Sequence, residues 1–219
     1  MKKKIITADG SFSVFDSVLN ETYHSINGAL TESLHVYINS GLLFWKNKMK
    51  KQSNFCNIFE MGFGTGLNAL LAKRFSDQKK FKVNFFSIEK FPLSSSLYNS
   101  IKPIDLSLSE EKIFKAPWNK KFLISKFFTI TKIKGDYLDF NYRKSFDIVF
   151  YDPFGYNTQP NLWSKKALKI SFDLLNKGGV WVSYCSKGKV RRDLLELGMK
   201  VHRLDGPPGK REIIRAIKV

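Results

Sequence analysis

The chain has 219 residues, 43% of them apolar, so it can bury one sizeable core, and a second full domain would not fit comfortably. Its two cysteines, Cys56 and Cys185, stand in apolar stretches without metal-ligand spacing, which indicates buried thiols in a reducing compartment and excludes a disulfide framework or a metal site. The net charge of +18 favours a polyanionic partner, nucleic acid before membrane, and a lysine-rich solvated surface is the alternative.

The N-terminal stretch MKKKIITADGSFSV has three lysines but no apolar run of the length that an export signal needs. Nowhere do about 18 uninterrupted apolar residues occur, so we expect a cytoplasmic chain without a membrane partner. Residues 21–45 place apolar residues at mixed helical spacing and predict one or two helices. We expect a single domain and a monomer, with residues 1–50 as an N-terminal helical extension and residues 51–219 as the core.

Strands and helices alternate from residue 54 onward. Apolar runs rich in β-type residues predict seven strands, at residues 54–61, 82–89, 127–136, 146–152, 180–185, 199–205 and 211–219. Helical patterns separate them, including a long one that starts near Pro160 and ends before a glycine pair. This order predicts an α/β fold with an open, mostly parallel sheet, helices on both faces, an antiparallel hairpin at one edge and a ligand crevice at the carboxyl ends of the strands.

A glycine-rich turn follows the first of these strands. Gly62, Gly64 and Gly66 let the backbone turn tightly and let a ligand approach closely. Their G-x-G-x-G spacing disfavours dinucleotide and phosphate-loop sites, and the carboxylate of Glu60 would oppose a pyrophosphate but suits an ammonium group. The turn resembles motif I of the class I S-adenosylmethionine-dependent methyltransferases, which have a Rossmann-like fold and a cofactor with an amino-acid end and no phosphate.

Acidic residues end the next strands, and the same resemblance gives them roles. Glu89 matches the acid that binds the ribose hydroxyls, Asp136 the residue that meets the adenine, and Asp152 a catalytic-site motif. Any one of them alone is equally well an exposed strand-end acid. The cofactor-binding residues that the resemblance implies are Glu60, Gly62, Phe63, Gly64, Thr65, Gly66, Asn68, Glu89, Lys90, Asp136 and Asp152.

A closer resemblance covers almost the whole chain. It rests on TADGSFSVFDSVLNETYHSINGALTESLHVYINSGL, FEMGFGTGLN, SIEKFPL, DPF with QPNLWS, and SKGKVRRDLLELGMKV through GKRE, in this order. Together they resemble the methyltransferase family that completes 5-methylaminomethyl-2-thiouridine at the wobble position of certain bacterial tRNAs. The chain is similar to the standalone form, because it ends at Val219 without a flavin-binding oxidase domain. It departs from the family at Pro153, where Ala or Gly is usual, and residues 106–133 match no motif.

The resemblance implies methyl transfer from S-adenosylmethionine to the primary amine of a 5-aminomethyl group on uridine, in the anticodon loop of tRNA. An aliphatic amine with a pKa of about 10 is mostly protonated at pH 7, so the enzyme must favour and orient the neutral form. Asp152 is the candidate catalytic residue that orients the amine and accepts a proton.

Further residues are candidates for contact with the substrate. Lys210 and Arg211 match GKRE, and Phe154 and Trp163 are candidates for stacking on the splayed wobble base, although both aromatics read equally well as core. The family's N-terminal motif is matched by Tyr23, His24, Ser25 and Glu32, and here too packing in the core is the plain alternative for the first two.

Basic residues concentrate toward the C-terminus. A possible phosphate-binding face, or else a merely solvated one, is formed by Lys187, Lys189, Arg191 and Arg192. Three other functions stay open from the sequence: methylation of another RNA or of a small-molecule amine, aminopropyl transfer, and a non-catalytic RNA-binding module. The net charge argues against a small cationic acceptor, and the glycine turn with its strand-end acids argues against a module without catalysis.

Overall fold

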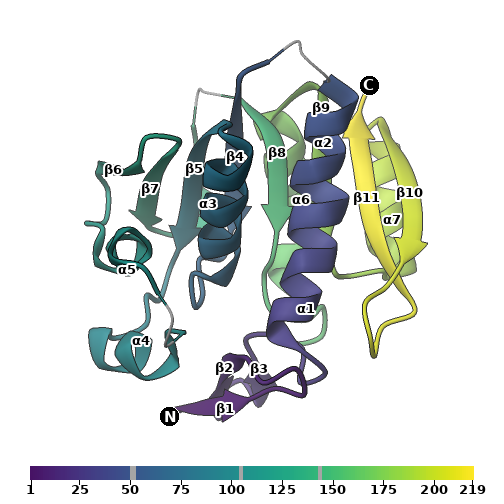
Figure 1. Cartoon of the computed structure of the whole chain (residues 1–219). Coiled ribbons are helices and arrows are strands. Elements are labelled where there is room, and N and C mark those ends of the chain that lie inside the picture. The colour runs from purple at the N-terminus through teal and green to yellow at the C-terminus, as the bar shows by residue number, and fades with distance from the viewer. Residues whose placement is uncertain (50–52, 104–105, 143–144) are drawn as a thin grey trace.

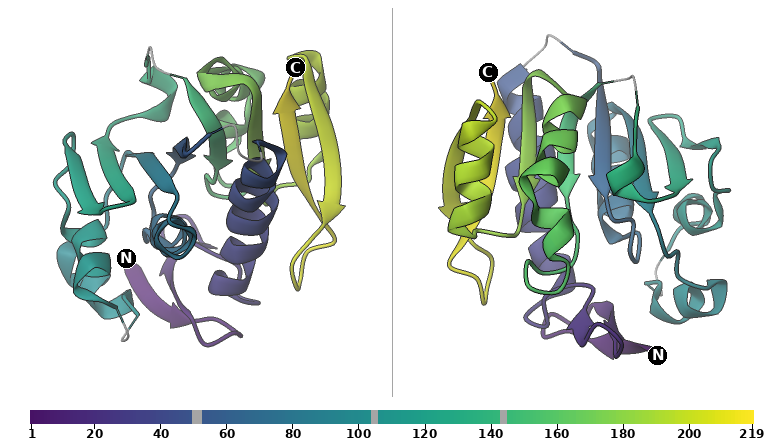
Figure 2. Two further views of the ribbon diagram at one scale, coloured as in Figure 1. Left: turned by 45° about the horizontal axis from the view of Figure 1, so that its top comes forward. Right: turned by 180° about the vertical axis from the view of Figure 1, so that it is seen from behind.

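The computed structural model describes residues 1–49, 53–103, 106–142 and 145–219, so the expected boundary at residues 50 and 51 lies outside the described residues. Its centre is an eight-stranded sheet in the order β10-β11-β9-β8-β4-β5-β7-β6. Helices cover both faces of this sheet (Figure 1). One face carries α3 and a long N-terminal helix, and Figure 2 shows α6 and α7 on the opposite face. The Rossmann-like α/β architecture is therefore confirmed.

Five neighbouring strands of the sheet are parallel and end at the same edge, as predicted. They are β4 (Phe55–Met61), β5 (Lys82–Glu89), β7 (Phe128–Lys134), β8 (Phe146–Tyr151) and β9 (Leu175–Ser183). The predicted C-terminal hairpin is confirmed as β10 (Met199–Asp205) and β11 (Glu212–Lys218), which pair antiparallel. The prediction of seven strands is wrong, because β6 (Lys121–Ser125) adds an antiparallel strand at the other edge.

The N-terminal segment differs most from its prediction. A separate three-stranded antiparallel sheet replaces the first part of the expected helical extension, with β1 (Lys2–Ile6), β2 (Phe12–Asp16) and β3 (Glu21–Thr22). The turn between β1 and β2 is held by the Asp9 carboxylate, which accepts hydrogen bonds from the backbone N–H groups of Ser11 and Thr31. Such side-chain contacts favour a turn over a helix.

One continuous helix follows this sheet and packs against the main sheet. It consists of α1 (Ala29–Ser33), a π-helical segment η1 (Leu34–Leu43) and α2 (Phe44–Met49). The prediction of helix for residues 21–45 is therefore confirmed only from Ala29 onward. Gly41 allows the close approach, because a Cβ atom there would lie 3.0 Å from Val182 and 3.1 Å from Phe150.

The remaining helices connect the strands. They are α3 (Leu67–Lys79), α4 (Ser95–Ile101), α5 (Leu108–Lys115), the 3₁₀ turns η2 (Tyr137–Asp139) and η3 (Pro160–Trp163), α6 (Lys165–Leu174) and α7 (Gly188–Glu196). The long helix expected from Pro160 is divided, because the Ser164 hydroxyl accepts a hydrogen bond from Ala167 N and starts α6 anew. Strand β9 also begins earlier than predicted, before the glycine pair Gly178 and Gly179.

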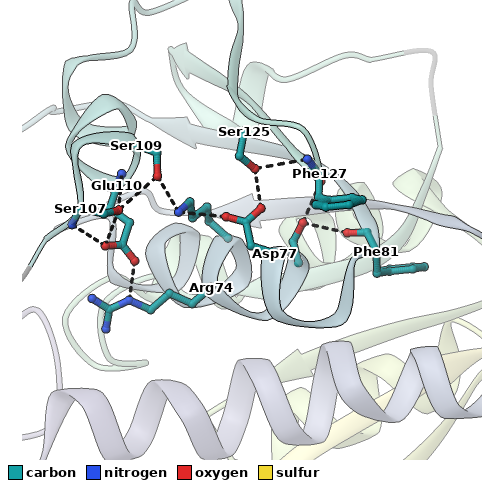
Figure 3. A network of polar contacts seen from close by, with 10 residues as sticks. Arg74, Asp77, Phe81, Ser107, Ser109, Glu110, Ser125 and Phe127 are labelled. Carbon is teal, nitrogen blue, oxygen red and sulfur yellow. Dashed lines mark hydrogen bonds and ion pairs between the residues drawn. The ribbon is translucent and has the colours of Figure 1, made fainter.

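Polar contacts join the unassigned residues 106–133 to helix α3 (Figure 3). Ser107 and Glu110 form a capping box at the start of α5, and the Glu110 carboxylate also pairs with Arg74 Nε at 2.7 Å. Lys73 Nζ donates to Ser109 Oγ at 2.8 Å. Further bonds hold the β6–β7 turn: Ser125 Oγ donates to Asp77, and Ser76 Oγ donates to the carbonyl oxygens of Phe81 and Phe127. Residues 106–133 are therefore tied to α3 by hydrogen bonds, which stabilise the edge of the sheet at β6 and β7.

Apolar residues fill both faces of the sheet. Neighbouring residues of one strand, such as Ile58 and Phe59 on β4, belong to two different buried clusters because successive side chains point to opposite faces. Cys56 and Cys185 are buried free thiols, as predicted. Within the described part of the chain, no helix combines the length and apolar character needed to cross a membrane.

Candidate active site

A cavity of about 1190 Å³ opens at the carboxyl ends of the parallel strands. Residues of the glycine turn and of the loops after β5, β7, β8 and β9 line one side of it. Residues of the N-terminal sheet and of helix α1 line the other side, so the small sheet at the base of Figure 1 borders the crevice. This is the position that the strand order predicted for a ligand.

The glycine turn forms the floor of the cavity. Gly62 has φ +90°, and a Cβ atom there would lie 2.8 Å from the backbone oxygen of Asp152. Gly64 N donates to Glu89 Oε2 at 3.1 Å, which joins the turn to the end of β5. Only residues without a side chain fit this close contact between two loops, which explains the glycine at position 62.

Two of the predicted cofactor residues lie outside the cavity lining. Gly66 caps helix α3 with φ +78°. Glu60 lies behind the turn with 1% of its surface exposed, where its Oε2 accepts a hydrogen bond from Ser87 Oγ at 2.6 Å. Burial raises the pKa of Glu60 well above its ordinary value. The structure therefore places Glu60 beneath the site rather than at its surface.

The strand-end acids occupy the cofactor side of the cavity. Glu89 Oε1 accepts a hydrogen bond from Phe91 N at 2.9 Å, and Lys90 Nζ pairs with Asp136 Oδ2 at 2.7 Å. This pair lowers the pKa of Asp136. Carboxylates at the ends of two neighbouring strands are suitable acceptors for ribose hydroxyls and an amino group. Together with a glycine turn that leaves room for a ligand backbone, the residues present fit S-adenosylmethionine.

Asp152 lies between the two sides of the cavity, directly after β8. Its Oδ1 accepts a hydrogen bond from Tyr37 Oη at 2.5 Å, and its Oδ2 accepts one from Asn68 Nδ2 at 2.8 Å. Burial raises the pKa of Asp152 to about 7, against the lowering effect of these hydrogen bonds. The nearby Glu32 carboxylate raises this pKa further and the Lys210 ammonium lowers it. A carboxyl group with such a pKa can exchange protons near neutral pH.

Tyr37 and Tyr184 line the cavity and were not predicted as site residues. Tyr184 Oη donates to the carbonyl oxygen of Pro153 at 2.8 Å, which fixes the loop after Asp152. Tyr37 reaches the site from the π-helical segment η1. The sequence offers no signal for that segment, since an α-helical projection would place Tyr37 about 140° from Glu32, at 100° per residue.

The N-terminal motif residues meet at the other side of the cavity. His24 contacts Ser13 Oγ through Nδ1 at 2.9 Å and Thr65 Oγ1 through Nε2 at 3.2 Å. Burial lowers the pKa of His24 to about 4, so its imidazole is neutral at pH 7. His24 therefore joins the N-terminal segment to the glycine turn rather than acting as a general acid.

Glu32 and Lys210 form an ion pair within the cavity lining. The Glu32 side chain is 8% exposed and also accepts a hydrogen bond from Ser25 N at 2.9 Å. Lys210 Nζ lies 3.9 Å from the centre of the Tyr184 ring, a cation–π contact. The structure thus brings the predicted residues Ser25, Glu32 and Lys210 together, whereas Arg211 is exposed and lies outside the cavity lining.

The two candidate stacking residues lie in different surroundings, one at the cavity and one in the core. Phe154 lines the cavity and packs edge-to-face against Tyr23, with ring centres 4.8 Å apart. Trp163 is fully buried, and its Nε1 donates to the carbonyl oxygen of Phe154 at 2.8 Å. Trp163 is therefore a core residue that supports the loop of Phe154, and the expectation that it stacks on a base is wrong.

The basic residues in and next to α7 differ in their contacts. Lys189 pairs with Asp193 at 2.8 Å, which raises the pKa of Lys189. Lys187 and Arg192 are exposed, and Lys187 Nζ lies 5.9 Å from the Tyr156 ring centre. In the described ranges there is no cluster of three or more His, Cys, Asp or Glu side chains that could hold a metal ion.

The fold is that of the class I S-adenosylmethionine-dependent methyltransferases, and the residues of the cavity fit this cofactor. Residues 126–219 match the family described as S-adenosyl-L-methionine-dependent methyltransferase. Among solved structures, the fold resembles MNMC2 from Aquifex aeolicus, with a TM-score of 0.78, 27% identity, and coverage of 99% of this chain and 70% of that one. DesVI from Streptomyces venezuelae, at 12% identity and a TM-score of 0.51, shares the fold alone.

Curated relatives agree with this assignment. The chain is 28% identical to the tRNA 5-methylaminomethyl-2-thiouridine biosynthesis bifunctional protein MnmC of Chromobacterium violaceum, over 90% of this chain and 32% of that protein. The identity to the protein of the same name from Leptospira interrogans is also 28%, over 96% of this chain and 34% of the relative. The chain thus spans about a third of the length of these relatives.

Proposed function

We propose that the chain methylates the primary amine of 5-aminomethyl-(2-thio)uridine at the tRNA wobble position, giving 5-methylaminomethyl-(2-thio)uridine. The observation that carries this proposal is the Asp152 carboxyl group, held by Tyr37 and Asn68 at the junction between the cofactor side and the N-terminal side of one cavity. The names of the relatives with full-chain similarity support the same substrate.

Bound S-adenosylmethionine supplies a sulfonium methyl group. Glu89 and Asp136 would hold the adenosine end, and the glycine turn would lie against the bound cofactor. Asp152 would accept a hydrogen bond from the acceptor amine, so that the nitrogen lone pair points at the methyl carbon. The surplus proton that the nitrogen carries once it is methylated would pass to Asp152.

The acceptor side of the cavity suits a nucleobase from a single-stranded loop. Phe154 and Tyr23 offer aromatic surface there, and Glu32 and Lys210 offer polar groups. Only a base that leaves its stack can reach such a cavity, which fits an anticodon loop. The net charge of +18 provides the attraction that tRNA phosphates require. A monomeric, single-domain enzyme that works in the cytoplasm, where tRNA is found, completes the proposal.

Nucleoside mass spectrometry tests the proposal directly. The protein is incubated with S-adenosylmethionine and tRNA from cells that lack this methylation, and we expect one methyl group to be added to 5-aminomethyl-2-thiouridine. Asp152→Asn should reduce the rate at least 100-fold, because the amide cannot take the proton. Tight cofactor binding without any methylated nucleoside would contradict the proposal and favour a different acceptor. Weak or absent cofactor binding would favour the non-catalytic module.

A further inference from the structure

Tyr37 is buried where the long N-terminal helix reaches the cavity beside Asp152. Only 2% of its surface is exposed, and its hydroxyl donates to Asp152 Oδ1 at 2.5 Å. Its ring packs against Phe150, with ring centres 5.2 Å apart. Phe150 precedes Asp152 by two residues on β8, so Tyr37 contacts both the strand that carries the carboxylate and the carboxylate itself.

The helix backbone accounts for this reach. Glu32 and Tyr37 are five residues apart, yet both line the cavity. The segment Leu34–Leu43 is π-helical, with i→i+5 hydrogen bonds, and it begins directly after α1, so its wider turn changes the direction of Tyr37 relative to Glu32 on α1. Gly41 then lets the segment lie against Phe150 and Val182, where a Cβ atom would be crowded at 3.0 to 3.1 Å.

We propose that Tyr37 is a positioning residue, which the π-helical segment aims at Asp152 so that the carboxylate keeps one orientation toward the acceptor amine. This inference rests on the proposed function. Asn68 holds the second oxygen from helix α3, so both oxygens of Asp152 are fixed from different elements. A carboxylate held in this way already has the orientation that the reaction needs when the amine binds.

The phenol also affects the proton affinity of Asp152. Its hydrogen bond favours the charged carboxylate and opposes the effect of burial. Burial and neighbouring carboxylates raise the pKa of Tyr37 well above its ordinary value, so the phenol stays a donor across the working pH range. The titratable and polar groups that face Asp152 are Glu32 on α1, Tyr37 on η1, Glu60 on β4, Asn68 on α3, Tyr184 after β9 and Lys210 after β10.

A carbon-13 NMR titration of aspartate carboxyl groups tests this role without substrate. The Asp152 resonance is assigned by its absence in Asp152→Asn, and its midpoint in the wild-type protein is expected near pH 7. Tyr37→Phe removes one hydrogen bond to the charged form, so the midpoint should rise by about one pH unit. The matched control is Tyr151→Phe, which removes a buried phenol hydrogen bond to Leu162 and should leave the midpoint in place.

The pH profile of methyl transfer gives the second measurement. In Tyr37→Phe the acid limb should move upward with the NMR midpoint, with the rate about fivefold lower at pH 7 and largely recovered near pH 9. Gly41→Ala, which displaces the helix from β8, should move the limb in the same direction. A loss of rate that is equal at every pH, or an unmoved Asp152 midpoint, would assign Tyr37 to structure alone and overturn the proposal.

The two measurements separate this inference from the proposed function. If the wild-type protein methylates no tRNA, the proposed function fails, and the NMR titration still decides whether Tyr37 controls Asp152. Cofactor affinity and thermal melting of Tyr37→Phe verify that the variant is folded. Should it fail to fold, the titration and pH profile of Gly41→Ala decide the question instead.

Discussion

Asp152 is a single carboxyl group on which burial and hydrogen bonding act in opposite directions. Burial has the larger effect and raises its pKa to about 7 in the folded chain, against an ordinary value near 3.8. Between these two values the folded state binds more protons than the unfolded state, so its stability falls as pH rises. The uncharged amide of Asp152→Asn lacks this dependence.

We therefore expect Asp152→Asn to gain stability relative to the wild type as pH rises from 4 to 7, by about 1.4 kcal/mol per pH unit at most. Above pH 7 the difference should stay constant, since both states are then ionised. Denaturant unfolding of both proteins at intervals between pH 4 and pH 8 measures it. A difference that does not change with pH would show that folding leaves the pKa of Asp152 unchanged.

The glycine turn is an element whose backbone and contacts both exclude a side chain. Gly62→Ala places a Cβ atom 2.8 Å from the Asp152 carbonyl oxygen, on a backbone with φ +90°. We expect cofactor affinity to fall more than tenfold in this variant, because the turn must shift. Gly198→Ala is the matched control, since Gly198 has φ +87° and nothing within 4 Å of an added Cβ atom. Calorimetry should show unchanged cofactor binding in the control; an equal loss in both variants would refute the contact argument.

Helix α5 is an element that stabilises the fold without touching the cavity. Its capping box joins Ser107 and Glu110, and Ser107→Ala should cost about 1 kcal/mol of unfolding free energy. The methylation rate should stay at the wild-type level, because neither residue lines the cavity. Denaturant unfolding and the methylation assay check the two halves of this prediction. A loss of activity in the folded variant would give residues 106–133 a role in the site.

At the scale of the whole molecule, charge would govern the encounter with the proposed tRNA substrate. The exposed residue Lys187 is the N-cap of α7, and the exposed residue Arg192 lies in the middle of this helix. If both contact phosphates, replacing them with Gln should lower the slope of log affinity against log salt by roughly two units. Lys79 and Lys80, at the end of α3, are a charge-matched control that should leave the slope unchanged. If filter-binding assays give both double variants the same slope of log affinity against log salt, the basic residues of α7 are solvated and do not contact phosphates.

Local signals in the sequence predicted the parallel sheet and the side of the cavity that the glycine turn and the strand-end acids form. Apolar runs that end in an acid placed Glu89, Asp136 and Asp152 at one sheet edge, because parallel strands share the direction of their carboxyl ends. The glycine spacing placed the turn beside them. Family-like segments placed Glu32 and Lys210 near the cavity, and the structure joins them as an ion pair. All of these signals reside in short stretches of the chain.

Only the tertiary structure decided which side chains meet. Trp163 is core rather than surface because η3 turns it inward, and β6 is a strand only because β7 offers an edge to pair with. Tyr37 reaches Asp152 through a π-helical register and a helix position that depend on packing against β8 and β9. The sequence by itself therefore determined the chain order of the five parallel strands and of the C-terminal hairpin, since period and strand ends are local properties. The resemblance of the glycine turn to a known motif indicated the cofactor. Contacts between residues 115 positions apart were decided by packing, which no local pattern encodes.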